Sequence, residues 1–425
     1  MRIDEQALRA GDATPRCPVS GLGAEFNPFI DPYLADPYPF WERARAAEPV
    51  FFSPELNYWV VTRHEDIKNV FADPKTFSAA NAQTPIQPIA PEAIEYLKVG
   101  GLKTRPVISN SDPPDHTRVR KFIWQAFTPK RVADLEPAVR RIVNGFIDRI
   151  EGERRVDLVK AMFYDLPVHV LFLFLGMRED EIPKVKTWAH NRLMLTWGRL
   201  TPEQQMAEAR GMLAFWKYTE AYVHSLLSNP PDNYVGDLLR VHLNDNGDLS
   251  LNEIDNVVFG LLIAGHETTT SMSGNAVRTL LSRRAHWDDL CARPEVIPDA
   301  VEELVRFDTS VVAWRRKTTK AVQISGVDIP QGADLLLALC SGNRDDRHFE
   351  QPNELNFARD NVRSHLSFGF GIHYCLGAPL ARLELKVILE ELTRRLPGLR
   401  LAPDQTWEFS PNTSFRGPMQ LWVEW

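Results

Sequence analysis

The feature that most constrains the fold is a helical pattern without proline, which runs from Leu251 to about Arg284. Ser250 and Glu253 precede and open this stretch with the spacing of a capping box, in which each side chain bonds the backbone N–H of the other residue. At 1.5 Å per residue, the roughly 34 residues would form a helix about 50 Å long. The sequence therefore predicts one long helix that crosses the whole molecule.

The centre of this stretch has an unusual composition for a helix. Residues 264–270 read AGHETTT, so a glycine and three threonines lie in mid-helix. Glycine and β-branched hydroxyl residues are unfavourable in helix interiors. A helix that continues through such a segment is stabilised by its surroundings, and its centre is a candidate functional site.

The rest of the chain predicts a mainly α fold with small β-sheets. Residues 112–290 have an almost entirely helical pattern, and another helix begins near His64. Strand patterns occur at residues 58–62, 321–329 and 334–339 and in the last residues, LWVEW. The 425 residues show no repeat and no low-complexity linker, so we expect residues 1–425 to form a single domain.

Composition excludes several classes of protein. Lys and Arg number 49 against 56 Asp and Glu, and the net charge of −7 argues against nucleic-acid binding. The four cysteines are scattered, which excludes a zinc knuckle and is typical of a reducing compartment. The N-terminus is polar and the apolar runs are too short to span a bilayer, so we expect a cytoplasmic protein without a membrane anchor.

The strongest chemical signal is the segment FGFGIHYCLG, residues 368–377, in which three glycines surround Cys375. Glycines permit a tight loop and the close approach of a bulky partner. A cysteine just before a helix N-terminus meets free N–H groups that stabilise its thiolate. A lone cysteine in a turn is more often a small buried side chain, but the complete ten-residue arrangement favours a thiolate ligand.

This segment resembles the haem-binding loop of the cytochrome P450 family, and the resemblance extends over essentially the whole chain. It implies the cytochrome P450 fold, in which the long central helix lies over haem b. Cys375 would be the axial ligand of the iron, and Phe368 and Gly377 would belong to the haem-binding loop. Residues 264–268 resemble the oxygen-binding groove of the family, which would place Ala264 and Gly265 against the haem.

The resemblance also implies donors for the two haem propionates. Residues 112–120, DPPDHTRVR, resemble the helix that meets them, with Asp112 expected as the helix cap and the prolines in the first turn. His116 and Arg120 would lie on one face of that helix; as an isolated pair they would more often be solvated. Arg316 and His373 match the other two donor positions, although the neighbouring Arg315 is an alternative to Arg316.

Glu303 and Arg306 resemble the Glu-x-x-Arg pair of the family, which is buried and joined by an arginine from the loop before the cysteine. Taken alone, this spacing is common in surface ion pairs. Arg359 is the expected third member, and Arg363 is the alternative. Removing one member of such a buried network would strand a charge, at a cost of about 3–5 kcal/mol.

The implied reaction inserts one oxygen atom of O2 into a small, apolar or aromatic substrate, with electrons from a reductase or ferredoxin. Glu267 would relay protons, and Thr268 would keep oxygen from leaving as hydrogen peroxide. The resemblance also implies the residues of the substrate pocket: residues 88–104, Leu261, Leu262, Ala264, Gly265, residues 309–312, and Thr413 and Ser414.

Two other functions share parts of this pattern. A haem-thiolate peroxygenase would use Cys375 with hydrogen peroxide, but it normally lacks an acid–alcohol pair such as Glu267 and Thr268. A non-catalytic haem sensor would need no proton relay and should carry an output domain. The segment CPVSG, residues 17–21, is similar to the haem domains of self-sufficient members; we expect no reductase domain on this chain, because few residues follow Arg416 and no cysteine cluster could bind an iron–sulfur centre.

Overall fold

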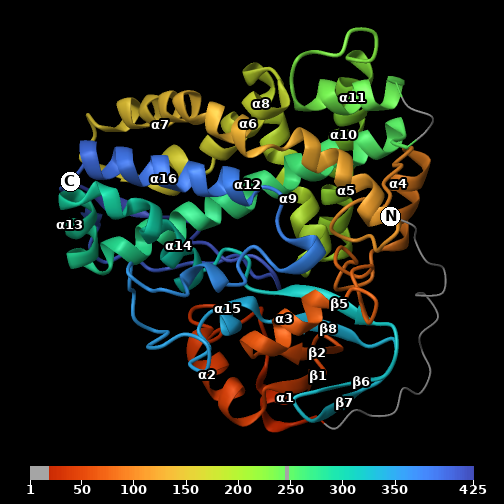
Figure 1. The fold of residues 1–425 in the computed structure, drawn as a ribbon, viewed down its shortest axis with the longest axis horizontal. Coiled ribbons are helices and arrows are strands. Elements are labelled where there is room, and N and C mark those ends of the chain that lie inside the picture. Colours follow the sequence, from red (N-terminus) through yellow and green to blue (C-terminus); the bar gives the residue numbers. More distant parts are fainter. Residues whose placement is uncertain (1–18, 245–247) are drawn as a thin grey trace.

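The computed structural model describes residues 19–244 and 248–425, in which a large helical part packs on a smaller part built around a sheet (Figure 1). Cys17, the first residue of the CPVSG segment, lies outside the described residues. The helices are α1 (Gly21–Glu25), α2 (Tyr38–Ala47), α3 (His64–Ala72), α4 (Pro91–Val99), α5 (Asp115–Ala126), α6 (Pro129–Asp134), α7 (Glu136–Ile150), α8 (Leu166–Leu175), α9 (Ile182–Trp197), α10 (Pro202–Ser225), α11 (Tyr234–Asn244), α12 (Leu251–Leu281), α13 (Arg284–Ala292), α14 (Ile297–Phe307), α15 (Leu339–Gly342) and α16 (Ala378–Arg395).

The strands form one larger sheet and two small ones. The larger sheet has the order β1-β2-β8-β5-β3, and only β2 and β8 pair in parallel in it. A second sheet has the order β4-β10-β9, and β6 pairs with β7. The strands are β1 (Val50–Ser53), β2 (Tyr58–Val61), β3 (Phe77–Ser78), β4 (Arg155–Asp157), β5 (Trp314–Thr318), β6 (Val322–Ile324), β7 (Val327–Ile329), β8 (Asp334–Leu337), β9 (Arg400–Leu401) and β10 (Trp422–Glu424).

These elements confirm the predicted mainly α fold with small sheets. The four predicted strand segments correspond to β2, the β6–β7 pair, β8 and β10. Strand β4 lies within the region that was predicted to be almost entirely helical. It is three residues long and pairs with β10, more than 260 positions later in the chain, so its partner rather than its local pattern specifies it.

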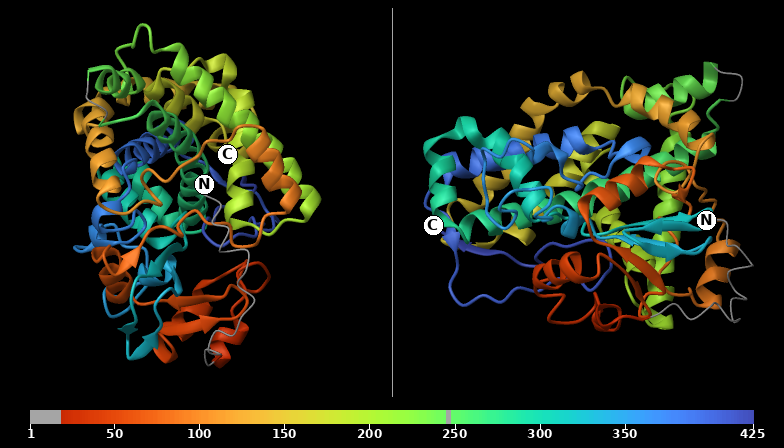
Figure 2. Two further views of the ribbon diagram at one scale, coloured as in Figure 1. Left: turned by 90° about the vertical axis from the view of Figure 1, so that its right-hand side faces the viewer. Right: turned by 60° about the horizontal axis from the view of Figure 1, so that its bottom comes forward.

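The long helix is present as α12, which lies at the centre of the helical part (Figures 1 and 2). Its capping box is confirmed, because the Ser250 hydroxyl accepts from the Glu253 N–H at 3.3 Å and Glu253 Oε2 accepts from the Ser250 N–H at 2.8 Å. The helix ends at Leu281, three residues before the expected Arg284, where α13 begins. Helices α8, α9, α10 and α16 pack against it.

Neighbouring segments stabilise the weak centre of α12. His266 Nε2 hydrogen-bonds the Tyr164 carbonyl at 2.9 Å, and the Thr270 hydroxyl donates to the Phe163 carbonyl at 2.9 Å. Gly265 lets α8 approach, because a Cβ there would lie 3.3 Å from the Leu171 side chain. The helix therefore continues through the unfavourable segment because side chains and close packing hold it from outside.

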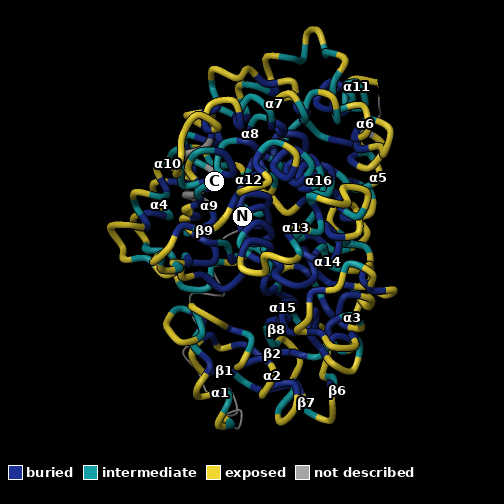
Figure 3. Tube along the Cα trace, turned by 90° about the vertical axis from the view of Figure 1, so that its left-hand side faces the viewer, coloured by how far each residue is buried: buried dark blue, intermediate teal, exposed yellow. Residues whose placement is uncertain are grey.

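Burial follows the same arrangement. Most residues of α12 and α16 are buried, as are all four residues of β2 (Figure 3).

Within residues 19–244 and 248–425, no helix is long and apolar enough to cross a membrane.

Candidate active site

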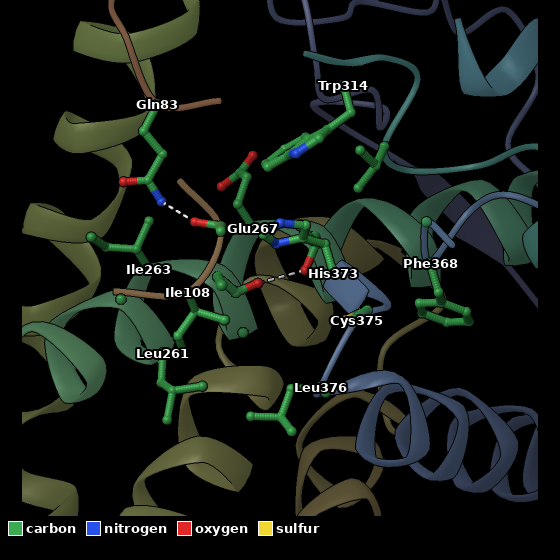
Figure 4. Close-up of a pocket in the computed structure, with 18 of the residues that line it drawn as sticks. Gln83, Ile108, Leu261, Ile263, Glu267, Trp314, Phe368, His373, Cys375 and Leu376 are labelled. Atoms are coloured by element: carbon green, nitrogen blue, oxygen red, sulfur yellow. Dashed lines mark hydrogen bonds between the residues drawn. The ribbon is translucent and has the colours of Figure 1, made fainter. Parts of the chain in front are cut away.

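A cavity of about 370 Å³ lies between α12 and the loop that carries Cys375 (Figure 4). Elements from both parts of the molecule contribute to its wall. His116 is the one predicted site residue that does not line the cavity, but its ring contacts His373, with 4.2 Å between the ring centroids. The predicted site residues in the wall are Arg120, Ala264, Gly265, Glu267, Thr268, Arg316, Phe368, His373, Cys375 and Gly377.

The glycine-rich loop presents Cys375 to the cavity. The Cys375 N–H donates to the Phe368 carbonyl at 2.8 Å, which closes the loop. Gly371 has a φ of +70°, and a Cβ there would lie 2.7 Å from the Phe71 carbonyl oxygen. Only glycine fits this position without strain. Cys375 lies deep among protein atoms but is exposed to the cavity that it lines, whereas Cys340 is buried in the sheet-containing part.

The surroundings of the Cys375 sulfur act in opposite directions on its ionisation. Burial among protein atoms raises the pKa of the thiol, while the N–H groups of Gly377 and Ala378 and the charge of Arg120 lower it. The N–H groups belong to the start of α16, as the sequence predicted for a cysteine that precedes a helix. A metal ion at the sulfur would favour the thiolate further.

Four potential cations lie together at or beside the cavity: His116, Arg120, Arg316 and His373. Among the described residues, none of the four forms an ion pair with a carboxylate. Both ring nitrogens of His116 and Nη2 of Arg316 are buried without a hydrogen-bond partner, and His373 has no hydrogen bond of good geometry. Burial lowers the pKa of His116 to about 4, that of His373 to about 2 and that of Arg316 to about 10.

Asp112 does not cap α5, so that prediction is wrong. The helix begins at Asp115 after Pro114, without a side-chain cap. The Asp112 carboxylate instead accepts from the Ser78 hydroxyl and from the Ala79 N–H, the latter at 2.8 Å. The Asp112 carboxylate therefore joins the start of α5 to strand β3. It accepts hydrogen bonds from Ser78 and Ala79 and none from His116, Arg120, Arg316 or His373.

This donor set fits a haem. Buried donors are almost always hydrogen-bonded, and leaving them unpaired is costly. A haem carries two carboxylates, which can accept charge-assisted hydrogen bonds from arginine and histidine, and an iron that thiolate ligates. The chain therefore offers an exposed sulfur and unpaired buried donors in one cavity, which are the two kinds of group that this cofactor requires.

The alternative between Arg315 and Arg316 is settled by the pleat of β5, since successive strand residues point to opposite faces. Arg315 donates to the backbone carbonyls of Ala82 at 2.9 Å and Thr84 at 2.5 Å and does not line the cavity. Arg316 lines it. Arg316 is therefore the one that faces the candidate haem site.

On α12, Glu267 and Thr268 both line the cavity, and Figure 4 shows Glu267 there. The Thr268 hydroxyl donates to the Ala264 carbonyl one turn earlier, at 2.6 Å. Because that bond uses the hydroxyl hydrogen, the lone pairs of Oγ1 remain able to accept a proton donor.

The Glu303 network lies outside the cavity and is complete. Arg306 donates from Nε and Nη2 to the two Glu303 oxygens, both at 2.7 Å, and all of these atoms are buried. Arg359 Nε lies 3.2 Å from both oxygens. Arg363 instead pairs with Glu302 at 3.3 Å and is largely exposed. Arg359, not Arg363, is therefore the third member.

The cavity wall differs in part from the predicted pocket. Leu262 is buried in the hydrophobic core. Residues 88–103, Thr309, Val312, Thr413 and Ser414 do not line the cavity either. No local pattern in the sequence marks the wall residues that were missed, because distant elements bring them together. They include Gln83, Arg105, Ile108, Leu193, Trp197, Met212, Trp314 and Phe415.

A mainly α fold with a long helix across a cavity that holds an exposed cysteine and unpaired cations defines a haem-thiolate protein. Comparison with known proteins agrees. The family model "Cytochrome P450" matches residues 275–406. The chain is 36% identical over 419 residues to nocardicin C N-oxygenase of Nocardia uniformis subsp. tsuyamanensis, covering 94% of this chain and 98% of that protein.

Solved structures are also similar. Cytochrome P450 CREJ in complex with (4-ethylphenyl) dihydrogen phosphate is 37% identical, with a TM-score of 0.91 and coverage of 95% of this chain and 100% of that one. An intact type IV self-sufficient cytochrome P450 monooxygenase is 40% identical, with a TM-score of 0.94 and coverage of 98% of this chain and 55% of that one. The chain belongs to the cytochrome P450 family, and it is a monooxygenase that uses haem.

Proposed function

We propose that residues 1–425 form one haem-binding domain that inserts an oxygen atom of O2 into a small, apolar or aromatic substrate. The observation that carries this proposal is the set of unpaired buried donors in the cavity that exposes Cys375. The net reaction is RH + O2 + 2e⁻ + 2H⁺ → ROH + H2O. The cofactor is haem b. Among the proteins named above, one is an N-oxygenase of nocardicin C and another is in complex with (4-ethylphenyl) dihydrogen phosphate.

The residues at the cofactor have two tasks in this proposal. Cys375 ligates the iron, and thiolate ligation pushes electron density that favours O–O cleavage. His116, Arg120, Arg316 and His373 bind the two propionates. Gly265, Ala264, Phe368 and Gly377 leave room for the ring between α12 and the loop. When bound, the haem supplies the redox chemistry, while the chain supplies ligand, orientation and protons.

Glu267 and Thr268 deliver the two protons. The Glu267 carboxylate takes protons from solvent and releases them into the cavity. The Thr268 hydroxyl donates to the Ala264 carbonyl, so its oxygen is free to accept a hydrogen bond from the cavity side and would hold a proton donor there. The two residues occupy successive positions of α12, so both are fixed by one rigid helix.

The electrons come from a reductase or ferredoxin, either fused to the same polypeptide or separate. The intact self-sufficient monooxygenase to which this chain is similar is nearly twice as long as the region that matches. The extra length supports a fused electron-transfer partner in that protein. A peroxygenase is the alternative function, and the acid–alcohol pair of Glu267 and Thr268 argues against it.

The test replaces Thr268 by alanine and, as a matched control, by serine, which keeps the hydroxyl. With a compatible reductase, we expect Thr268→Ala to bind substrate and consume reductant, while product per reductant falls roughly tenfold and hydrogen peroxide rises. Thr268→Ser should remain near the wild type. Glu267→Gln should instead slow turnover itself by roughly 100-fold. If the ratio of product to reductant is unchanged in Thr268→Ala, the hydroxyl has only a structural role in α12.

A further inference from the structure

A cluster of side chains that can ligate a metal ion lies between helices α10 and α12. Glu220 and His224 are four residues apart in α10, so both project from one face of that helix. Asp255 lies in the first part of α12, which packs against α10. The possible ligand atoms of the three side chains all lie within 4.8 Å of one another. Among the described residues, no other group of His, Cys, Asp or Glu side chains brings three ligand atoms this close together.

The Asp255 carboxylate is the buried member of this cluster, and its charge is poorly compensated. Only 2% of the residue is exposed, and its Oδ1 has no hydrogen-bond partner in the part of the chain that the structure describes. Burial raises the pKa of Asp255 to about 6, although the neighbouring His224 acts to lower it. A buried carboxylate is costly unless cations or hydrogen bonds compensate its charge, so this side chain calls for a further partner.

The other oxygen of this carboxylate, Oδ2, faces His224. The distance from His224 Nε2 to Asp255 Oδ2 is 3.3 Å. Hydrogen bonds between charged groups are usually shorter, at about 2.7–2.9 Å. Two ligand atoms on one tetrahedral zinc ion, with bonds of about 2.0–2.1 Å, lie about 3.3–3.4 Å apart. The observed distance therefore suits an ion shared by the two atoms better than a direct hydrogen bond.

An ion can reach these atoms from the solvent side of the cluster. The side chains of His224 and Glu220 are 43% and 27% exposed, and Asp255 lies beneath them. Lys103 Nζ lies 3.6 Å from Glu220 Oε1, but the Lys103 side chain is 67% exposed and can turn into solvent. Rotation of the partly exposed Glu220 side chain would then bring its carboxylate within ligand distance of the ion. Lys103 is therefore a competitor of the ion for Glu220.

The ligand atoms indicate which class of ion would bind. The cluster offers one imidazole nitrogen and two carboxylate oxygens, which are ligand types that zinc binds, with a water molecule as the fourth ligand. Magnesium and calcium are bound by oxygen atoms, so the imidazole does not suit them. The cluster contains no thiol, so it does not suit the softest ions, such as Cu(I).

We propose that Glu220, His224 and Asp255 form a zinc site that fastens α10 to α12. The two helices contribute Met212 and Val257 to the wall of the cavity, so the ion restrains two parts of that wall relative to each other. None of the three ligands lines the cavity. The ion therefore takes no part in the proposed oxygenation, and the zinc site does not depend on the proposed function.

The test uses the haem-loaded protein, freed of other metal ions with a chelator, and zinc chloride as the probe. Calorimetry should show one zinc ion bound per chain, and zinc should raise the melting temperature, because it binds the folded state. His224→Gln and Asp255→Asn each remove one ligand. Each should weaken zinc binding at least roughly tenfold, since loss of a residue that only supports a ligand already costs about 10–100-fold.

A third variant should change the affinity in the opposite direction. Lys103→Gln removes the cation that competes for Glu220, so zinc binding should strengthen by up to about fivefold, the usual worth of an exposed ion pair. The matched control is His242→Gln, which removes a histidine of α11 outside the cluster and should leave the affinity unchanged. Because His224 is exposed, its substitution keeps the test decisive if Asp255→Asn folds poorly, and haem content checks the fold of each variant.

X-ray absorption at the zinc edge identifies the ligands in the wild type. It should show only nitrogen and oxygen ligands at about 2.0–2.1 Å, whereas a zinc–sulfur bond of about 2.3 Å would place the ion on a cysteine. The inference is overturned by sulfur ligation, by no zinc binding at millimolar zinc, by wild-type affinity in His224→Gln, or by weaker binding in Lys103→Gln.

Discussion

Two clusters of buried ionisable side chains differ in whether other residues of the described chain supply ion-pair partners for them. In the first, which we call the scaffold network, Glu302 and Glu303 bind five basic side chains: Arg306, Arg359, Arg363, His365 and Arg382. In the second, which we call the cavity cations, His116, Arg120, Arg316 and His373 form no ion pair among the described residues. Both clusters are largely buried, so burial alone does not explain the difference.

The ionisation of the two clusters shows what the difference means. Burial alone would raise the pKa of Glu302, but hydrogen bonds from His365 and Arg382 together lower it to about 2. At the cavity, burial dominates and lowers the pKa of His116 to about 4 and that of His373 to about 2. The first cluster is completed by its own chain and serves the scaffold, whereas the second, beside the cavity, is where we propose that the two propionates bind.

The largest expected effect comes from breaking the scaffold network. Glu303→Gln leaves Arg306 and Arg359 buried without a carboxylate, which should lower the free energy of unfolding by about 3–5 kcal/mol. Soluble yield and haem content should fall together, and denaturant unfolding measures the loss. The control is Glu295→Gln, on the surface before α14, which should have no effect. A fully stable Glu303→Gln protein would show that the network is not needed for the scaffold.

Removing a cavity cation should have a different outcome. Arg316→Gln takes away a buried charge that no residue pairs, so unfolding of the polypeptide should be little changed. Haem binding should weaken by about 1.5–3 kcal/mol, the value of a hydrogen bond to a charged group. Transfer of haem to an acceptor protein measures this. Lys317→Gln, its exposed neighbour, is the control, and equal haem loss in both variants would contradict the assignment of Arg316.

Acid should act mainly on the scaffold network. Because the folded-state pKa of Glu302 is about 2, below its ordinary value of 4.5, its contribution is complete above about pH 4.5. It is lost as the pH falls from there through about 2. We expect this loss to be on the order of 3 kcal/mol and to be absent in Glu302→Gln. Denaturant unfolding at successive pH values tests it, and parallel curves for both proteins would contradict it.

Features that depend only on residues close together in the sequence could be predicted from local patterns. The capping box of Ser250 and Glu253 and the long helix α12 follow from residues within one turn of each other and from a periodic pattern. The glycine loop around Cys375 is equally local, which is why a tight loop just before a helix could be predicted there. Asp112 shows the limit, because its tendency to cap a helix was overridden by hydrogen bonds to Ser78 and Ala79, more than 30 positions earlier.

Partners that lie far apart in the sequence could not be predicted. Arg359 and Arg363 are only four positions apart, and only the folded chain shows that Arg359 meets Glu303, 56 positions away. The cavity wall is a stronger case, since Trp197, Trp314 and Phe415 line it together and come from three segments with no shared pattern. The sequence therefore predicted that the glycine loop and the centre of α12 meet at one site, but it missed wall residues that distant segments contribute.

The central claim is that Cys375 ligates a haem iron which the cavity cations help to bind. The most direct test is the difference spectrum of the reduced protein with CO, recorded for the wild type, Cys375→Ser and Cys291→Ser. The account predicts a thiolate-type spectrum for the wild type and for Cys291→Ser, and its complete loss in Cys375→Ser, because an alcohol does not push electron density onto iron as a thiolate does. A thiolate-type spectrum that survives in Cys375→Ser would contradict it.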